Sequence, residues 1–313
     1  MEKLKRATSE QIEAALSRWT LPQIPESVCP EIKVPKTEFN VVSLSRPIQK
    51  KLTLTHRVEE KAAVELAIVD WLYHLVRANI KRGRVFELGD VLSRGYADCL
   101  GYAKLLCWLG KKFAVDISIV EVIIDNGGRY LPHYINLVKL AHSERRFVDM
   151  WYGSTNIRHQ RIGAQVKVKG RWKIEDLGWN ELERVKEIKG LPDKAVDGIT
   201  YYIIGNRHLE KGIAGLSEEL DKAIECYDLA IKLYPSARFY FNRAVAFENK
   251  GKCSHAKRDY ARAFKDEASI ARILAREHDE ITGLTELDRK GIGLQEQERY
   301  LLHKGFITGS KNR

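Results

Sequence analysis

The sequence predicts an α+β fold, in which a domain of helices and antiparallel strands precedes an all-helical domain. Helices with continuous apolar stripes are predicted over residues 56–79 and 99–110. They are followed by strands rich in β-branched residues at 114–124, 131–140 and 145–151. From Thr200 onward the periodicity becomes helical and repeats itself. We therefore divide the chain into an N-terminal helix and arm (1–55), a mixed domain (56–192) and a helical domain (198–313).

Composition excludes several classes of protein. The 313 residues are 44% hydrophobic, and no apolar run is long enough to cross a bilayer. The first ten residues lack the apolar core of a secretory signal, so we expect a cytoplasmic location. A net charge of +11 is compatible with nucleic-acid binding. Because no nucleic-acid motif accompanies that charge, we favour a solvated basic surface and expect neither a nucleic-acid nor a membrane partner.

A cysteine begins the second predicted helix. Asp98 is a good N-cap, which places Cys99 at the first helical position, and Gly110 is expected to end the helix. A thiol at this position faces unpaired N–H groups and the positive end of the helix dipole, which favour its thiolate form. The alternative is a small buried side chain, as free cysteines often are. None of the other four cysteines, Cys29, Cys107, Cys226 and Cys253, has a neighbour at disulfide or zinc spacing.

The strands that follow carry a histidine and an aspartate. A turn at 125–128 separates the first two strands. His133 lies near the start of the second, and Asp149 lies late in the third. If these two strands are antiparallel neighbours, the side chains can lie together, and Cys99 could complete a Cys–His–Asp triad.

Residues from about Gly95 to Trp151 resemble the transglutaminase-like superfamily of papain-type cysteine enzymes. The pattern of that family is a cysteine at a helix start, a Leu-Gly helix end, a histidine on a following strand and an aspartate on the next. Cys99, Leu109-Gly110, His133 and Asp149 fill these positions in order. The resemblance implies a papain-like catalytic domain in which Cys99, His133 and Asp149 are the catalytic residues.

Three positions depart from the family pattern. Ala97 stands where a glycine is common, Ile135 where a tryptophan often follows the histidine, and Met150 where a proline often follows the aspartate. These departures leave a degenerate, inactive site open as an alternative.

The remaining segments of the first half are given simpler interpretations. A short helix is predicted at 9–19, and the proline-rich stretch 21–55 is expected to be an extended arm. Residues 82–93 are predicted to form a loop with at most a helical turn at 89–92. A strictly alternating strand is predicted at 166–174, followed by a helix at 179–188 that ends at Gly190-Leu-Pro192.

A repeat is present in the helical half. Ala223, Tyr227 and Ala230 recur 33 residues later as Ala256, Tyr260 and Ala263. Together with Pro235 and a first-helix pattern at 240–251, they resemble tetratricopeptide repeats, which implies stacked helix pairs with a face for binding protein. The alternative is a helical packing module without a ligand, since two repeats make a small solenoid. Residues 212–218 are interpreted as an insertion, and 268–313 as capping helices.

From these patterns and resemblances we expect a cysteine-dependent acyl-transfer enzyme, most simply a protease or amidase acting on a protein or peptide. A protein-glutamine acyltransferase uses the same intermediate with an amine acceptor. The alternative is an inactive scaffold that mediates protein–protein interaction. No cofactor is expected, and no acidic loop has the ligand spacing of a metal site.

Overall fold

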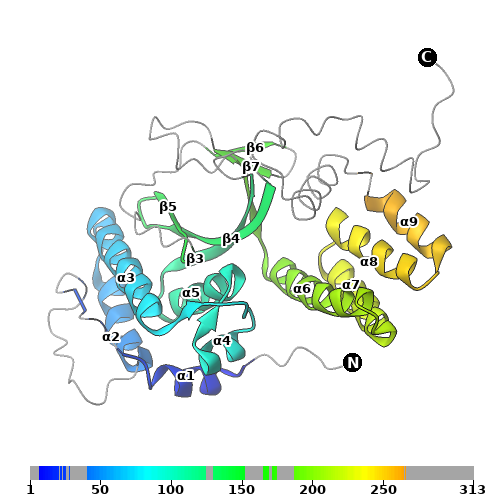
Figure 1. Ribbon diagram of the computed structural model, residues 1–313. Coiled ribbons are helices and arrows are strands. Elements are labelled where there is room, and N and C mark those ends of the chain that lie inside the picture. The colour runs from blue at the N-terminus through cyan, green and yellow to red at the C-terminus, as the bar shows by residue number, and fades with distance from the viewer. Residues whose placement is uncertain are drawn as a thin grey trace, which may run out of the picture. The chain divides into compact units, whose positions relative to one another are not determined.

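The computed structural model describes residues 7–20, 22, 24–25, 28, 41–124, 130–151, 165–168, 171–174, 187–263 and 265. The chain divides into two compact units, Met1–Leu191 and Pro192–Arg313. The first combines helices with antiparallel strands, and the described part of the second is helical (Figure 1). This mixture of elements is compatible with the predicted α+β class.

An antiparallel sheet organises the first unit. Its strand order is β5-β4-β3-β8-β7-β6, and every neighbouring pair is antiparallel. The six strands are β3 (Asp116–Ile124), β4 (Tyr130–Lys139), β5 (Arg145–Val148), β6 (Gln165–Val168), β7 (Arg171–Ile174) and β8 (Glu187–Leu191). The predicted antiparallel pairing of strands 131–140 and 145–151 is therefore confirmed where residues 136–139 of β4 pair with residues 145–148 of β5.

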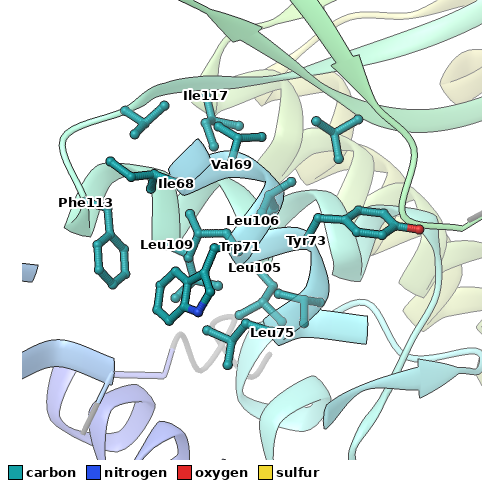
Figure 2. Close-up of a cluster of buried hydrophobic side chains, with 14 of the residues drawn as sticks. Ile68, Val69, Trp71, Tyr73, Leu75, Leu105, Leu106, Leu109, Phe113 and Ile117 are labelled. Carbon is teal, nitrogen blue, oxygen red and sulfur yellow. The ribbon is translucent and has the colours of Figure 1, made fainter. Parts of the chain in front are cut away.

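The helices of the first unit build its main core against this sheet. They are α1 (Ser9–Leu16), α2 (Val41–Leu54), α3 (Val58–Asn79), α4 (Leu88–Arg94) and α5 (Cys99–Lys112). Figure 2 shows side chains of α3 and α5 packed together, with Ile117 of β3 beside them. The Trp71 and Phe113 rings meet edge to face at 5.5 Å. Each fully buried large apolar side chain contributes about 1.5–3 kcal/mol, so this contact anchors α5 firmly.

The start of α5 agrees with the prediction, whereas its end does not. Asp98 is the N-cap, and its carboxylate accepts from the Gly101 N–H at 2.8 Å. The helix continues past Gly110 to Lys112. Gly110 is instead a packing position, because a Cβ there would lie 2.7 Å from Cγ1 of Ile117.

The expectation of an extended arm over 21–55 is wrong at its C-terminal end, where α2 forms. Leu44, Ile48 and Leu52 recur at helical spacing and are at most 3% exposed. Pro47 lies within this helix and removes one backbone donor. Burial of the apolar stripe compensates for that loss. Residues 29–40 lie outside the described part of the chain.

The predicted helix at 179–188 is also wrong where it can be compared. Residues 187–191 form β8, in which Ile188 pairs with Val122 on one side and Trp172 on the other. Two flanking strands supply hydrogen bonds to both edges, which outweighs the local helical pattern. The strand predicted at 166–174 is in fact a hairpin of β6 and β7. Residues 179–186, and the side chains of β6 and β7, lie outside the description.

The second unit contains helices from its beginning. Its described helices are α6 (Asp193–Ile213), α7 (Ser217–Leu233), α8 (Ala237–Asn249) and α9 (Cys253–Ala263), and each packs on the next. The segment interpreted as an insertion is the end of α6 and a turn at Gly215, whose φ of +110° suits glycine. The six predicted repeat positions are all buried: Ala223, Tyr227, Ala230, Ala256, Tyr260 and Ala263. The predicted capping helices at 268–313 fall beyond the described residues.

Candidate active site

A short backbone ladder holds the residues that precede Cys99. Strands β1 (Lys81–Arg82) and β2 (Tyr96–Ala97) pair in parallel, with Arg82 opposite Ala97. The Gly83 N–H donates to the Ala97 carbonyl at 2.8 Å, and the Asp98 N–H donates to the Val85 carbonyl at 2.7 Å. Cys99 follows immediately as the first residue of α5 and is partly exposed. The thiol is therefore carried by a segment that is hydrogen-bonded up to the helix start.

The helix that connects the two strands of this ladder is longer than predicted. The single turn expected at 89–92 is α4, which runs from Leu88 to Arg94. It ends at Gly95, whose φ of +70° is the left-handed conformation typical of a glycine helix terminus. The chain then turns directly into β2 and toward Cys99.

His133 and Asp149 are brought together by adjacent strands. His133 lies on β4, opposite Val122 of β3, and Asp149 directly follows β5. His133 Nε2 and Asp149 Oδ2 are 2.8 Å apart, and both side chains are largely buried. Because a carboxylate can only accept, Nε2 carries the proton of this hydrogen bond. The other carboxylate oxygen, Oδ1, accepts from the Trp151 N–H at 3.0 Å, so both oxygens of Asp149 have a partner.

The third residue of the predicted set also reaches His133. Burial alone would lower the pKa of the imidazole, but hydrogen bonds with Asp149 and with the Cys99 side chain raise it to about 9. Since Nε2 faces Asp149, the remaining ring nitrogen, Nδ1, is the one available to the thiol. The structure thus brings Cys99, His133 and Asp149 into one hydrogen-bonded row, with a protonated imidazole at neutral pH.

Asn136 is a residue of this site that sequence reasoning missed. It is fully buried on β4, and its Nδ2 donates to the Ala103 carbonyl of α5 at 2.9 Å. It therefore joins the strand that carries His133 to the helix that carries Cys99. An amide between the apolar residues Ile135 and Leu137 was the signal for it in the sequence, because a buried polar group requires a partner.

Two arginines beside the row were missed as well. Arg77 Nη1 donates to the Met150 carbonyl at 3.2 Å. The Arg82 guanidinium lies over the Trp151 ring, with Cζ 5.7 Å from the ring centroid. No pattern in the sequence predicted that residues of α3 and β1 would lie next to the residues that follow β5. Only the folded chain places them there.

The three positions that depart from the family pattern are all buried. Ala97 is 0% exposed, Ile135 3% and Met150 2%. Each fills space in the interior and leaves the hydrogen bonds of the triad in place. Among the described residues, no group of three or more His, Cys, Asp or Glu side chains could hold a metal ion. In the same part of the chain, no helix has the length and apolar character needed to cross a membrane.

The spatial order of the three side chains resembles that of a nucleophile, a base and an acid that orients the base. A thiol at a helix N-terminus lies next to an imidazole, and a carboxylate holds the far side of that ring. Comparison of the chain with protein-family models, with curated proteins and with solved structures gave no match in any of the three.

Proposed function

We propose that the first unit is a cysteine-dependent acyl-transfer enzyme that hydrolyses a peptide or amide bond. The observation that carries this proposal is the hydrogen-bonded row of Cys99, His133 and Asp149. The resemblance of residues 95–151 to transglutaminase-like enzymes supports the same assignment of roles. A papain-like arrangement, with a helix-borne cysteine packed on an antiparallel sheet, is part of this proposal.

The first half of the reaction forms an acyl-enzyme. An imidazolium next to a thiol stabilises the thiolate, so Cys99 attacks the substrate carbonyl carbon as Sγ⁻. The oxyanion that forms is stabilised by the Cys99 N–H at the start of α5, where backbone donors have no partner within the helix. His133 then gives its proton to the leaving nitrogen as the C–N bond breaks, which leaves a thioester on Cys99.

The second half releases the acyl group. The neutral His133 accepts a proton from the incoming water as its oxygen attacks the thioester carbonyl. The C–S bond breaks, the carboxylic acid leaves, and the thiolate–imidazolium pair is restored. Asp149 keeps the ring oriented throughout, because its two oxygens are held by His133 Nε2 and the Trp151 N–H. An amine in place of water would make the same thioester yield a transamidation product.

The second unit is proposed to bind protein, as tetratricopeptide repeats do. Its helices are joined by short turns, and small alanines are buried where the helices cross. We expect a chain ending after Leu191 to hydrolyse a small amide but to lose preference for a protein target. The truncation has to retain Leu191, because this residue pairs with Ile119 in the sheet. Circular dichroism would establish that the truncated protein is folded before the two activities are compared.

The catalytic proposal is tested with a library of fluorogenic peptide amides. Wild-type protein should release the fluorophore, and Cys99→Ala and His133→Gln should not. A fluorescent primary amine added to the same reactions distinguishes transfer from hydrolysis, since only transfer attaches the amine to the peptide. Hydrolysis that persists in a folded Cys99→Ala variant would overturn the assignment of Cys99 as nucleophile.

A further inference from the structure

A short basic segment borders the candidate active site. Lys81, Arg82 and Arg84 are exposed, and the sequence Lys-Arg-Gly-Arg contains no acidic residue. We call these three side chains the basic strip. Neither the triad nor the acyl-transfer steps proposed above use them.

Backbone pairing places the strip next to Cys99. Lys81 and Arg82 form β1, which pairs with Tyr96 and Ala97 of β2. Ala97 is two residues before Cys99, so Arg82 lies across the ladder from the segment that delivers the nucleophile. Tyr96 is itself 45% exposed, which leaves this edge of the site open to solvent.

Arg82 also reaches the other end of the triad. Its guanidinium covers the ring of Trp151 at 5.7 Å, and the Trp151 N–H holds Asp149 Oδ1. The buried Tyr73 interacts electrostatically with both Asp149 and Arg82, so these two residues lie near each other. Arg82 therefore links the two sides of the site, because its backbone pairs with Ala97 and its guanidinium lies over Trp151.

A purely structural role would be to cover Trp151 and offset the charge of Asp149. That role concerns the Arg82 guanidinium, which lies over Trp151, and does not account for the exposed Lys81 of the same strip. Exposed cationic side chains around an active site raise the local concentration of anionic substrates and speed their association with the enzyme. Guanidinium groups bind carboxylates with particular geometric specificity.

We infer that the enzyme selects a peptide with an aspartate or glutamate next to the scissile bond, and that Arg82 is its main specificity residue. The inference rests on the proposed function, since it concerns the substrate of the same site. Arg82 binds the substrate carboxylate, and Lys81 and Arg84 add to the attraction.

The first experiment measures the charge preference of Cys99 itself, with iodoacetate as an anionic probe and iodoacetamide as a neutral one. The ratio of their alkylation rates at Cys99 is followed by mass mapping. We expect Arg82→Gln to lower this ratio by about threefold to tenfold, and added salt to lower it in the wild type. The readout is the ratio, because dividing by each variant's own iodoacetamide rate removes any general change in Cys99 reactivity. Arg57→Gln is the matched control, because Arg57 is exposed and its guanidinium pairs with Glu60 of α3.

The second experiment uses a pair of short peptides that differ only in glutamate or glutamine beside the same amide bond. The glutamate peptide should protect Cys99 from iodoacetamide at lower concentration, and Arg82→Gln should abolish the difference. If Cys99 is reactive but both measurements are insensitive to Arg82, the substrate inference is wrong while the catalytic proposal stands. If iodoacetamide does not modify Cys99 preferentially, the catalytic proposal itself fails, and the substrate inference fails with it.

Discussion

The side-chain amide of Asn136 donates a hydrogen bond to the Ala103 carbonyl at 2.9 Å and so joins strand β4 to helix α5. His133 is three residues before Asn136 on the strand, and Cys99 is four residues before Ala103 on the helix. The bond thus fixes the separation of the two elements that carry Cys99 and His133. Catalytic geometry is sensitive to displacements of about 1 Å, so this contact is expected to matter for reactivity as well as for stability.

Asn136→Leu should therefore weaken both properties. Loss of the buried hydrogen bond is expected to lower the free energy of unfolding by about 1–3 kcal/mol. The altered spacing of β4 and α5 should slow alkylation of Cys99 under conditions where the variant remains folded. Urea unfolding and mass-mapped iodoacetamide labelling measure the two effects. Asn249→Leu, at an exposed position of α8, is the control. Unchanged Cys99 reactivity in a destabilised Asn136 variant would limit Asn136 to a structural role.

Asp149→Asn should lower the pKa of His133 from about 9, because a hydrogen bond to Asp149 is one of the causes that raise it. Burial, which lowers the pKa, then has less opposition. A larger fraction of the imidazole would be neutral at physiological pH, and hydrolysis should fall by about 10²-fold or more. NMR titration of the His133 ring gives the pKa directly.

The matched control for that experiment is Asp70→Asn, which alters another aspartate next to a histidine, 4.0 Å from His74 on α3. It should leave the His133 titration and the rate of hydrolysis unchanged. A His133 pKa that is the same in wild type and Asp149→Asn would contradict the role given to Asp149.

Stability should depend on pH through His133. Its pKa is higher in the folded protein, about 9, than its ordinary value of 6.5, so the folded state binds this proton more tightly. The contribution is complete below a pH of 6.5 and is lost as the pH rises through about 9. Its size is on the order of 1–3 kcal/mol. The difference in unfolding free energy between wild type and His133→Gln should therefore shrink with rising pH, and a constant difference would contradict the raised pKa.

Two glycines of α5 should respond differently to alanine. At Gly101 a Cβ would lie 2.5 Å from the Val85 carbonyl oxygen, the atom that accepts from the Asp98 N–H. Gly101→Ala should thus displace the start of α5 and reduce Cys99 labelling. At Gly110 the Cβ would meet Ile117 instead, so overpacking should cost about 1–3 kcal/mol, partly offset by better helix propensity.

Comparison of the two variants separates the effects, since Gly110→Ala should leave labelling per folded molecule unaltered. Thermal unfolding and iodoacetamide kinetics measure both. Equal loss of Cys99 reactivity in the two variants would show that general destabilisation, rather than the Val85 contact, controls the thiol.

Among the cysteines of the described residues, Cys99 should react first with iodoacetamide at neutral pH. Burial raises the pKa of Cys226 to about 11, and the Cys107 thiol donates to the Ile117 carbonyl at 3.1 Å. Cys253 is exposed and serves as the internal comparison for Cys99. Mass mapping after brief treatment gives the order. Preferential modification of Cys107 or Cys226 would contradict the nucleophile assignment.

The sequence by itself determined those features that depend on neighbouring residues. The Asp98 cap and the position of Cys99 at the start of α5 follow from capping chemistry and helical spacing, and the strand patterns around His133 and Asp149 suggested the pairing of β4 with β5. Burial of Ala223 and Tyr227 likewise follows from helical periodicity. These are local preferences, and the fold agrees with them.

Only the tertiary structure decided the features that depend on distant partners. Helix α2 forms despite Pro47 because its apolar stripe is buried, and residues 187–191 become a strand because β3 and β7 flank them. The Asn136–Ala103 bond and the position of Arg82 over Trp151 join segments far apart in the chain. Long-range burial and strand pairing outweigh local propensity. Differences in secondary-structure propensity amount to less than about 1 kcal/mol per residue, whereas burial of a large apolar side chain stabilises the fold by more than that.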